Sequence, residues 1–256
     1  MGISSPEKRV TEYWTTRAKS FAAVRKNELG DDISERWMCE IARYLPAGSL
    51  DILDVGTGTG YFAILLSRRG HRVTGIDLTP AMIEEALTAA AREGVSPVFC
   101  RMDAQALTFP DNSFDAIVTR NLTWTLPDPK RAYAEWFRVL RPGGVLVNFD
   151  ADYAQNVRNQ NQAASNTTSA GVYGHIGVTN EMRAENDAIT LSMPAARHAR
   201  PDWDRELCRA LGFASCQADL TAGQRILRER DLSDAPLFLF TAKKPGGKCD
   251  ERCAVL

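Results

Sequence analysis

Histidine is scarce in this sequence, with three residues in 256, and no two cysteines show the C-x-x-C spacing of a structural zinc site. Most of the six cysteines lie in apolar patterns, where cysteine behaves as a small core residue. Ser–His–Asp, H-E-x-x-H and P-loop patterns are also missing. We therefore expect no bound metal, and a reducing, cytoplasmic setting.

Neither sign of charge is in excess, because 31 basic residues face 32 acidic ones. This balance provides no electrostatic footprint for a nucleic-acid backbone. No apolar run reaches the roughly 18 residues that a membrane helix needs, and the start MGISSPEKRVTEYW lacks the apolar core of a signal peptide. The composition therefore predicts a soluble protein that binds neither nucleic acid nor membrane, and it leaves open whether the protein is a monomer or a homodimer.

We expect residues 1–49 to form a helical cap. The segment from Pro6 to Phe21 is predicted to be helical, and a second helix is expected to begin near Asp32, with Glu35 as its capping partner. Apolar residues then recur at helical spacing until Pro46 ends the helix.

Residues 50–150 alternate between strand and helix, a pattern that implies parallel βαβ units with right-handed crossovers. Two further strands are expected after a helix at 201–211. The fold class predicted is α/β: a Rossmann-like, doubly wound, mostly parallel seven-stranded sheet with helices on both faces, an N-terminal helical cap and a polar insertion after the fifth strand. The expected strands are 50–55, 72–76, 97–101, 114–119, 145–149, 213–219 and 237–241.

We expect a single domain over 1–244. It comprises the cap (1–49), a cofactor-binding core (50–150), a polar insertion or lid (151–200), and a C-terminal helix and strand pair (201–244). The Asn-, Gln-, Ser- and Thr-rich insertion is of a length that is usually functional or disordered. Residues 245–256 read as a disordered tail in which Cys249 and Cys253 have no role in turnover. The last four residues also fit a prenylation box, which is the less favoured interpretation.

The strongest motif is LDVGTGTGYF, from Leu53 to Phe62, in which a buried strand runs into a glycine loop and then a helix. Glycines let a ligand approach the main chain, and a helix start offers unpaired N–H groups. A dinucleotide site would have the spacing G-x-G-x-x-G, but the sixth position from Gly56 is Tyr61. Asp54 lies inside the strand, and an acid there suits a ligand with an ammonium and a carboxylate better than a pyrophosphate.

An acid followed by G-x-G-x-G after the first strand resembles the class I S-adenosylmethionine-dependent methyltransferases, firmly over residues 50–150. Asp77 ends the second strand 17 residues after Gly60, where a carboxylate can accept both ribose hydroxyls. The resemblance implies that Leu78 and Met82 flank the adenosine, that Asp103 accepts from the adenine amino group, and that Ala104 meets the ring edge with its backbone. The cofactor-binding residues expected from the core are Asp54, Gly56, Thr57, Gly58, Thr59, Gly60, Asp77, Leu78, Met82, Asp103, Ala104 and Gln105.

Residues 120–124 follow the fourth strand, at the edge where open α/β sheets bind ligands. The backbone carbonyls of this segment, which includes Arg120 and Leu122, and the Asn121 side chain are expected to hold the methionine ammonium. The leader carrying Tyr13 and Arg17 resembles the cofactor-covering helix of small-molecule methyltransferases. Arg17 is expected to pair with the methionine carboxylate.

No general base stands out in the sequence, so the catalytic residues are left as candidates. The chemistry explains this, because methyl transfer from a sulfonium is a direct displacement that requires a base only when the nucleophile holds a proton. Trp124 is expected near the transferred methyl, and Asp150, Asp152 and Tyr153 are expected to face the same crevice. The candidates are Asn121, Trp124, Asp150, Tyr153 and His175. His71 and His198 are expected to be structural or idle.

The function predicted is a methyltransferase that uses S-adenosyl-L-methionine, releases S-adenosyl-L-homocysteine and acts on a small-molecule acceptor. The alternatives are an NAD-dependent Rossmann oxidoreductase and a non-catalytic S-adenosylmethionine-binding module. A nucleic-acid methyltransferase is ranked lower, because Asn121 is not followed by the Pro-Pro-Tyr of the amino-adenine enzymes.

Overall fold

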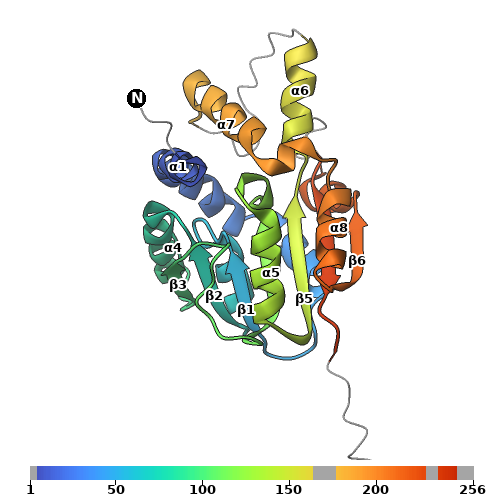
Figure 1. The fold of residues 1–256 in the computed structure, drawn as a ribbon. Helices are drawn as coiled ribbons and strands as arrows, with labels where there is room; N and C mark the ends of the chain where they lie inside the picture. The colour runs from blue at the N-terminus through green and yellow to red at the C-terminus, as the bar shows by residue number, and fades with distance from the viewer. Residues whose placement is uncertain (1–4, 164–176, 229–235, 247–256) are drawn as a thin grey trace, which may run out of the picture.

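One mixed sheet organises the molecule (Figure 1). The computed structural model describes residues 5–163, 177–228 and 236–246. In this part of the chain the strand order is β3-β2-β1-β4-β5-β7-β6, which confirms the predicted seven-stranded sheet. The strands are β1 (Asp51–Val55), β2 (Arg72–Asp77), β3 (Val98–Arg101), β4 (Phe114–Arg120), β5 (Leu140–Asp150), β6 (Ala214–Asp219) and β7 (Phe238–Lys243).

The first five strands are parallel. β1 pairs with β2 and β4, β2 with β3, and β4 with β5, whereas β7 runs antiparallel to both β5 and β6. Parallel neighbours require crossovers, which the helices between them provide. The carboxyl ends of these five strands therefore meet at one edge, which is where an open α/β sheet places its ligand site.

Helices cover both faces of the sheet. One apolar cluster joins α2, α3 and α9 to side chains such as Ile52 and Val147, and a second joins α5 and α8 to side chains such as Ile117 and Leu146. Successive residues of a strand point to opposite faces of the sheet. Since helices cover both faces, the buried strands carry apolar side chains on both sides. The helices are α2 (Ile33–Ala42), α3 (Tyr61–Arg68), α4 (Pro80–Arg92), α5 (Pro129–Val139), α8 (Asp202–Ala210) and α9 (Ala222–Leu227).

Three more helices lie beyond the carboxyl edge of the sheet (Figure 1). They are α1 (Pro6–Leu29), α6 (Tyr153–Ala163) and α7 (Asn180–Ser192), accompanied by the short 3₁₀ turns η1 (Thr123–Thr125) and η2 (Pro194–Arg197). α1 contacts α4 and α7, and α6 contacts α7. The predicted cap thus contains two helices, α1, which extends past Phe21, and α2, and much of the described part of the polar insertion is helical.

Two local expectations about where a helix and a strand begin were wrong. The Asp32 side chain makes no capping hydrogen bond, because it pairs with Arg36, while Glu35 pairs with Arg69 instead of reaching back to the helix start. The fifth strand begins at Leu140, not at 145, and pairs there with Phe114 before a register shift. α9 was not predicted, because its six residues are too few to show a helical period.

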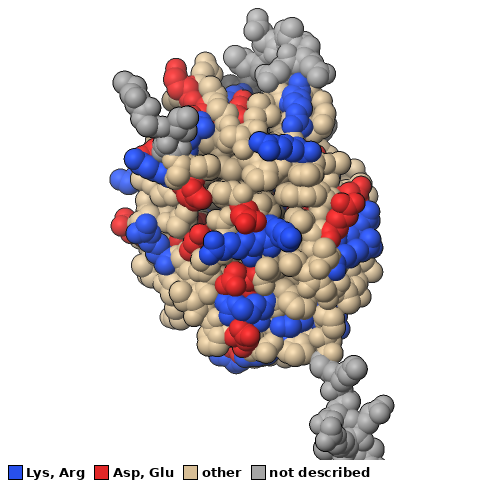
Figure 2. Space-filling view, in the orientation of Figure 1, with Lys and Arg blue, Asp and Glu red and all other residues tan. Residues whose placement is uncertain are grey.

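Charged side chains of both signs are interspersed on the face shown in Figure 2, without a continuous basic stripe. Within residues 5–163, 177–228 and 236–246, no helix is long and apolar enough to cross a membrane. The same residues contain no group of three or more His, Cys, Asp or Glu side chains that could hold a metal ion. Cys249, Cys253 and the last four residues lie outside the described part of the chain.

Candidate active site

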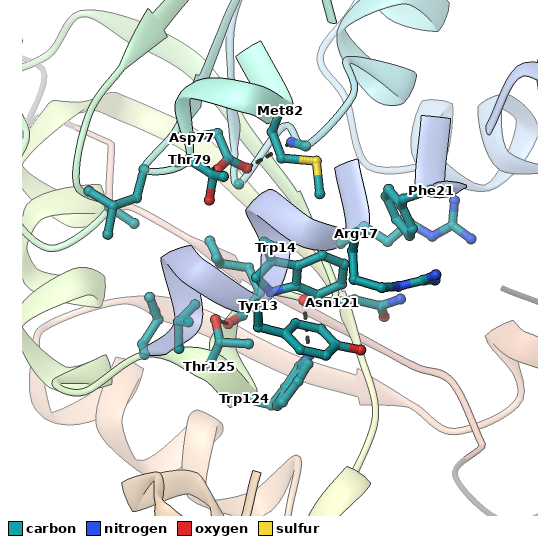
Figure 3. A pocket seen from close by; sticks show the side chains of 18 of the residues that line it. Tyr13, Trp14, Arg17, Phe21, Asp77, Thr79, Met82, Asn121, Trp124 and Thr125 are labelled. Carbon is teal, nitrogen blue, oxygen red and sulfur yellow. Dashed lines mark hydrogen bonds between the residues drawn. The ribbon is translucent and has the colours of Figure 1, made fainter. Parts of the chain in front are cut away.

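A cavity of about 420 Å³ opens above the carboxyl ends of the parallel strands. Its floor comes from the segments that follow β1, β2, β3, β4 and β5, and its roof from α1, α6 and α7. Figure 3 shows α1 crossing the cavity, with Asp77 and Met82 on one side of it and Trp124 and Thr125 on the other. The sequence motifs of the core and the helices outside it thus meet at one place.

The glycine loop forms one wall of this cavity. Gly56 and Gly58 have φ of 68° and 54°, a region that glycine adopts without strain. A Cβ on Gly56 would lie 2.8 Å from the Leu122 side chain, which would have to shift, and the positive φ would strain any other residue. Gly60 does not line the cavity, contrary to expectation. A Cβ on Gly60 would lie 2.9 Å from Phe99 and 3.1 Å from Ala86, so this glycine lets α3 start against α4.

Asp54 lies beneath the loop and is fully buried. Its Oδ2 accepts hydrogen bonds from the Thr57 hydroxyl at 2.6 Å and from the backbone N–H of Ala63 at 3.0 Å. These bonds tie the loop to the start of α3. Burial raises the pKa of Asp54 to about 7, and the nearby Asp77 adds to the rise. The carboxyl therefore titrates near neutral pH.

Asp77 reaches the cavity from the end of β2. Its Oδ2 accepts the backbone N–H of Gly58 at 3.0 Å, and its Oδ1 accepts that of Thr79 at 2.8 Å. The Leu78 backbone N–H and the Thr79 side chain also hydrogen-bond to this carboxyl group. Its two oxygens are thus held in fixed positions at the cavity, where a carboxylate suits a vicinal diol such as a ribose.

Asp103, Ala104 and Gln105 line the cavity where β3 ends. Gln105 is held on both sides, because its Nε2 donates to Asp103 at 3.1 Å and its Oε1 accepts the Asp128 backbone N–H at 2.6 Å. The Ala104 carbonyl accepts from Trp136 Nε1 at 3.0 Å, which fixes the backbone next to the cavity. Met82 and Leu78 add apolar surface beside this segment.

Asn121 occupies an unusual backbone position, with φ of 55°. Its N–H donates to the Phe149 carbonyl at 2.8 Å, and its carbonyl accepts from Trp124 Nε1 at 3.0 Å. Within the described residues, its side-chain Oδ1 is buried and has no hydrogen-bond donor. A buried acceptor without a donor is unfavourable, and a ligand ammonium in the cavity would satisfy it.

Aromatic side chains of α1 cover the cavity (Figure 3). The Trp14 ring packs edge-on against Tyr13 at 5.3 Å and against Phe21 at 5.4 Å, measured between ring centroids. Arg17 is buried beside them and donates to the Ser20 hydroxyl at 2.8 Å. Burial raises the pKa of Tyr13, although Arg17 acts in the opposite direction, so the phenol stays protonated at neutral pH.

The candidate catalytic residues divide into two groups. Asn121, Trp124 and Tyr153 line the cavity, and the Trp124 and Tyr153 rings lie 5.2 Å apart. Asp150 does not face it, contrary to expectation. It is completely buried, forms a 3.2 Å ion pair with Arg200, and accepts the Trp124 backbone N–H at 3.2 Å.

Three further polar residues within the described part of the chain also lie away from the cavity. Asp152 accepts the Gln155 backbone N–H at 3.0 Å at the start of α6. His198 stacks on Trp203, with ring centroids 4.2 Å apart. His71 accepts the Leu50 backbone N–H at 3.3 Å, which agrees with a structural role. His175 lies outside the described residues.

The other expected cofactor residues, from Tyr13 to Leu122, all line the cavity, but their part in binding stays a prediction. Several further lining residues could not be predicted from the sequence, because most of them belong to segments without a recognisable motif. Those with polar or charged side chains include Arg25, Asn156, Arg183, Asn186, Asp187 and Thr190. One local signal for α7 was Thr179, whose hydroxyl accepts the Met182 backbone N–H at the start of the helix.

Residues 53–148 match the family model described as a methyltransferase domain. The demethylmenaquinone methyltransferase of Thermus thermophilus is 42% identical over 98 residues, which cover 38% of this chain and 44% of that protein. The chain spans about half the length of the curated relatives that it matches.

Solved structures share the fold over most of the chain. Phosphoethanolamine N-methyltransferase 2 of Haemonchus contortus, solved with phosphomonomethylethanolamine and S-adenosylhomocysteine, has a TM-score of 0.59 at 19% identity, covering 81% of this chain and 52% of that one. The cyclase SpnF has a TM-score of 0.57 at 21% identity, covering 83% and 81%. One fold therefore serves more than one reaction.

Proposed function

We propose that this chain, which contains a class I S-adenosylmethionine-dependent methyltransferase domain, binds one S-adenosylmethionine in the cavity and transfers its methyl group to a small-molecule acceptor. The observation that carries the proposal is the joint position of Asp77 and Asn121. A preorganised carboxylate and a buried amide oxygen without a hydrogen-bond donor face one cavity beside the glycine loop.

The cofactor would be held by polar groups at its ends and apolar groups along its length. Asp77 accepts the ribose hydroxyls, and the Asn121 amide oxygen accepts the ammonium of the methionine part. Arg17 pairs with the carboxylate, since a guanidinium binds carboxylates with paired N–H donors. Gly56 and Gly58 allow the chain of the ligand to lie against the backbone.

The adenine would lie where β3 and β4 end. Asp103 accepts from its amino group, and the backbone of Ala104 meets the ring edge. Gln105 keeps this segment in place through its bonds to Asp103 and to the start of α5. Leu78 and Met82 pack on the adenosine from one side, with Leu122 from the other.

The bound cofactor supplies a methyl group that is already activated for displacement. The protein has to orient the acceptor and exclude water. Trp124 is suited to orient, because its ring nitrogen is fixed on the Asn121 carbonyl and its face packs near Tyr153. Tyr13 and Trp14 of α1 cover the same region and keep water out. Burial raises the pKa of Tyr153 well above its usual value, so it acts as a neutral hydrogen-bond donor.

The proposal that the acceptor is a small molecule rests on the helices that roof the cavity and on the named relatives. The named relatives act on small molecules and lipids, among them a demethylmenaquinone and phosphatidylethanolamine. Helices α1, α6 and α7 close over the floor of the cavity and favour a compact acceptor. For such an acceptor, we propose that the enzyme works in the cytoplasm and needs neither a nucleic acid nor a membrane as a partner.

The test is turnover with S-adenosylmethionine carrying a labelled methyl group and a panel of small-molecule acceptors. We expect acceptor-dependent formation of S-adenosylhomocysteine and a labelled product. A matched variant, Trp124→Phe, should slow turnover and leave cofactor affinity within about twofold. Binding of the cofactor without turnover on any acceptor would favour a non-catalytic module, and tight binding of NADH instead would favour an oxidoreductase.

A further inference from the structure

Helix α7 presents a polar face to the cavity. The residues of α7 that line the cavity recur at positions i, i+3, i+4 and i+7, which share one side of a helix: Arg183, Asn186, Asp187 and Thr190. A helix that packs on a protein usually turns an apolar stripe inward. A polar stripe that faces a cavity instead has a use when the ligand in that cavity carries a polar group.

The position of α7 puts this polar face on the acceptor side of the cavity. α7 contacts α1, α6, η1 and η2. η1 follows β4 and α6 follows β5, whereas the glycine loop, Asp77 and Asp103 follow β1, β2 and β3, which all lie on the other side of β4 in the sheet. Asn121, directly after β4, is the residue proposed to hold the methionine part of the cofactor. Because the transferred methyl group belongs to that part, an acceptor has to lie beyond it, below α7.

Aromatic rings line the same region. Trp14 comes from α1, Trp124 from η1 and Tyr153 from the start of α6, and they pack in one cluster with Ile189 of α7. The Trp124 and Tyr153 rings lie 5.2 Å apart, and Trp14 and Trp124 can be followed in Figure 3. The face of an aromatic ring attracts a cation as well as an apolar group. These walls therefore suit a ligand that combines an apolar body with a positive charge.

Asp187 is the acidic group of the polar face. Burial raises the pKa of this carboxyl, although the charge of Arg183 and a hydrogen bond with the Asn186 side chain act in the opposite direction. Burial is also the main cause of the raised pKa of Tyr13, and the charge of Asp187 adds to it, so Asp187 lies within electrostatic reach of the aromatic side chains of α1. The neighbours thus compensate only in part for the water that this carboxylate has lost, and a bound cation would complete the compensation.

We propose that the methyl acceptor carries a protonated amino group on an apolar body, with the amino group bound by the Asp187 carboxylate and the body packed against the rings of Trp14 and Trp124. This inference rests on the proposed function, because it concerns the acceptor half of the same cavity. An ammonium and a carboxylate form charge-assisted hydrogen bonds, and the ring faces attract the same charge. Glu7 of α1 also lines the cavity, and its negative charge favours a cation further.

The experiment measures binding of matched pairs of amines and alcohols by calorimetry at pH 7, with the protein saturated in S-adenosylhomocysteine. The pairs are benzylamine and benzyl alcohol, 2-phenylethylamine and 2-phenylethanol, and 3-phenylpropylamine and 3-phenylpropanol. We expect at least one amine to bind tenfold or more tightly than its alcohol. Asp187→Asn should remove this preference and leave S-adenosylhomocysteine affinity within about twofold.

A matched control separates recognition by Asp187 from a general effect of charge. Glu181→Gln removes one negative charge from the same helix outside the cavity and should retain the full preference for the amine. Asp187→Glu should retain part of it, because the carboxylate is kept and displaced.

Four outcomes overturn an assignment. Absence of amine preference in all three wild-type pairs overturns the proposal, as does a preference that Asp187→Asn leaves unchanged or that Glu181→Gln reduces equally. Loss of S-adenosylhomocysteine affinity in Asp187→Asn also overturns it, because Asp187 would then belong to the cofactor. Failure of the wild-type protein to bind S-adenosylhomocysteine overturns instead the proposed function on which this inference rests.

Discussion

The backbone N–H of Gly58 donates a 3.0 Å hydrogen bond to Oδ2 of Asp77. This bond connects the loop after β1 with the end of β2, so the position of the glycine loop depends on the carboxylate proposed to bind the ribose. The backbone N–H of Thr79 holds the other oxygen at 2.8 Å. Loop and carboxylate therefore form one preorganised unit.

Asp77→Ala should weaken S-adenosylhomocysteine binding by about 1.5–3 kcal/mol, because the ribose hydroxyls lose a charged acceptor and the loop loses its anchor. Calorimetry of the two proteins measures the difference. Asp51→Asn is the matched control, since Asp51 begins β1 at the opposite edge of the sheet, where it pairs with Arg72. Equal affinity in the Asp77 variant and the wild-type protein would remove Asp77 from the site.

Asp54 should make the fold less stable as pH rises through neutrality. Its ordinary pKa is 3.8, and burial raises the pKa in the folded protein to about 7. The folded state thus holds the proton more tightly than the unfolded state. The stabilisation is complete below about pH 4 and is lost as pH rises through about 7, by up to about 4 kcal/mol.

Asp54→Asn removes this titration and keeps an oxygen that can accept from Thr57 and Ala63. Urea unfolding of both proteins at pH 4, 5, 6 and 7 should show the variant gaining stability relative to wild type as pH increases. A difference that stays constant from pH 4 to 7 would mean that Asp54 keeps its ordinary pKa.

Removal of the Asp150 carboxylate should destabilise the protein by about 3–5 kcal/mol, because it leaves the buried Arg200 short of a counter-charge. Asp150→Ala can be compared with Glu12→Ala, which breaks an exposed ion pair with Lys8 and should change stability by about 0.5 kcal/mol or less. Denaturant unfolding provides both values. If the two variants lost similar amounts of stability, the ion pair of Asp150 would not contribute as its burial implies.

Gly60 and Gly70 allow a test of packing at constant backbone conformation, since both have φ of 83°. A Cβ at Gly70 has nothing within 4 Å, so Gly70→Ala should cost only the left-handed strain of about 1–2 kcal/mol. Gly60→Ala adds close contacts with Phe99 and Ala86 and should cost about 1–3 kcal/mol more. Because Gly60 does not line the cavity, cofactor affinity of the folded variant should stay at the wild-type level.

Apart from Tyr13 and Arg17 of α1, the cavity residues predicted from the sequence lie at or just after the end of a strand. The glycine loop and Asp77 lie at strand ends, and the parallel sheet brings such ends together. Short local motifs were therefore enough to predict that these residues share one edge. The strand pattern likewise predicted the sheet, because alternation of strands and helices leaves few possible topologies.

The parts that it missed depend on partners far apart in the chain. Asp150 also follows a strand, but its side chain turns away from the cavity because Arg200, 50 residues later, pairs with it. The placement of Asp187 in the wall of the cavity likewise depends on how α7 packs against α1, which no local pattern encodes. The polar insertion lacked a clear apolar period, so its helices α6 and α7 were not predicted.

Whether the cavity is an S-adenosylmethionine site can be measured by calorimetric titration of the full chain with S-adenosylhomocysteine and, separately, with NADH. We expect saturable binding of S-adenosylhomocysteine with one site per chain and no saturable binding of NADH at the same concentrations. Binding of NADH without S-adenosylhomocysteine, or binding of neither, would contradict it.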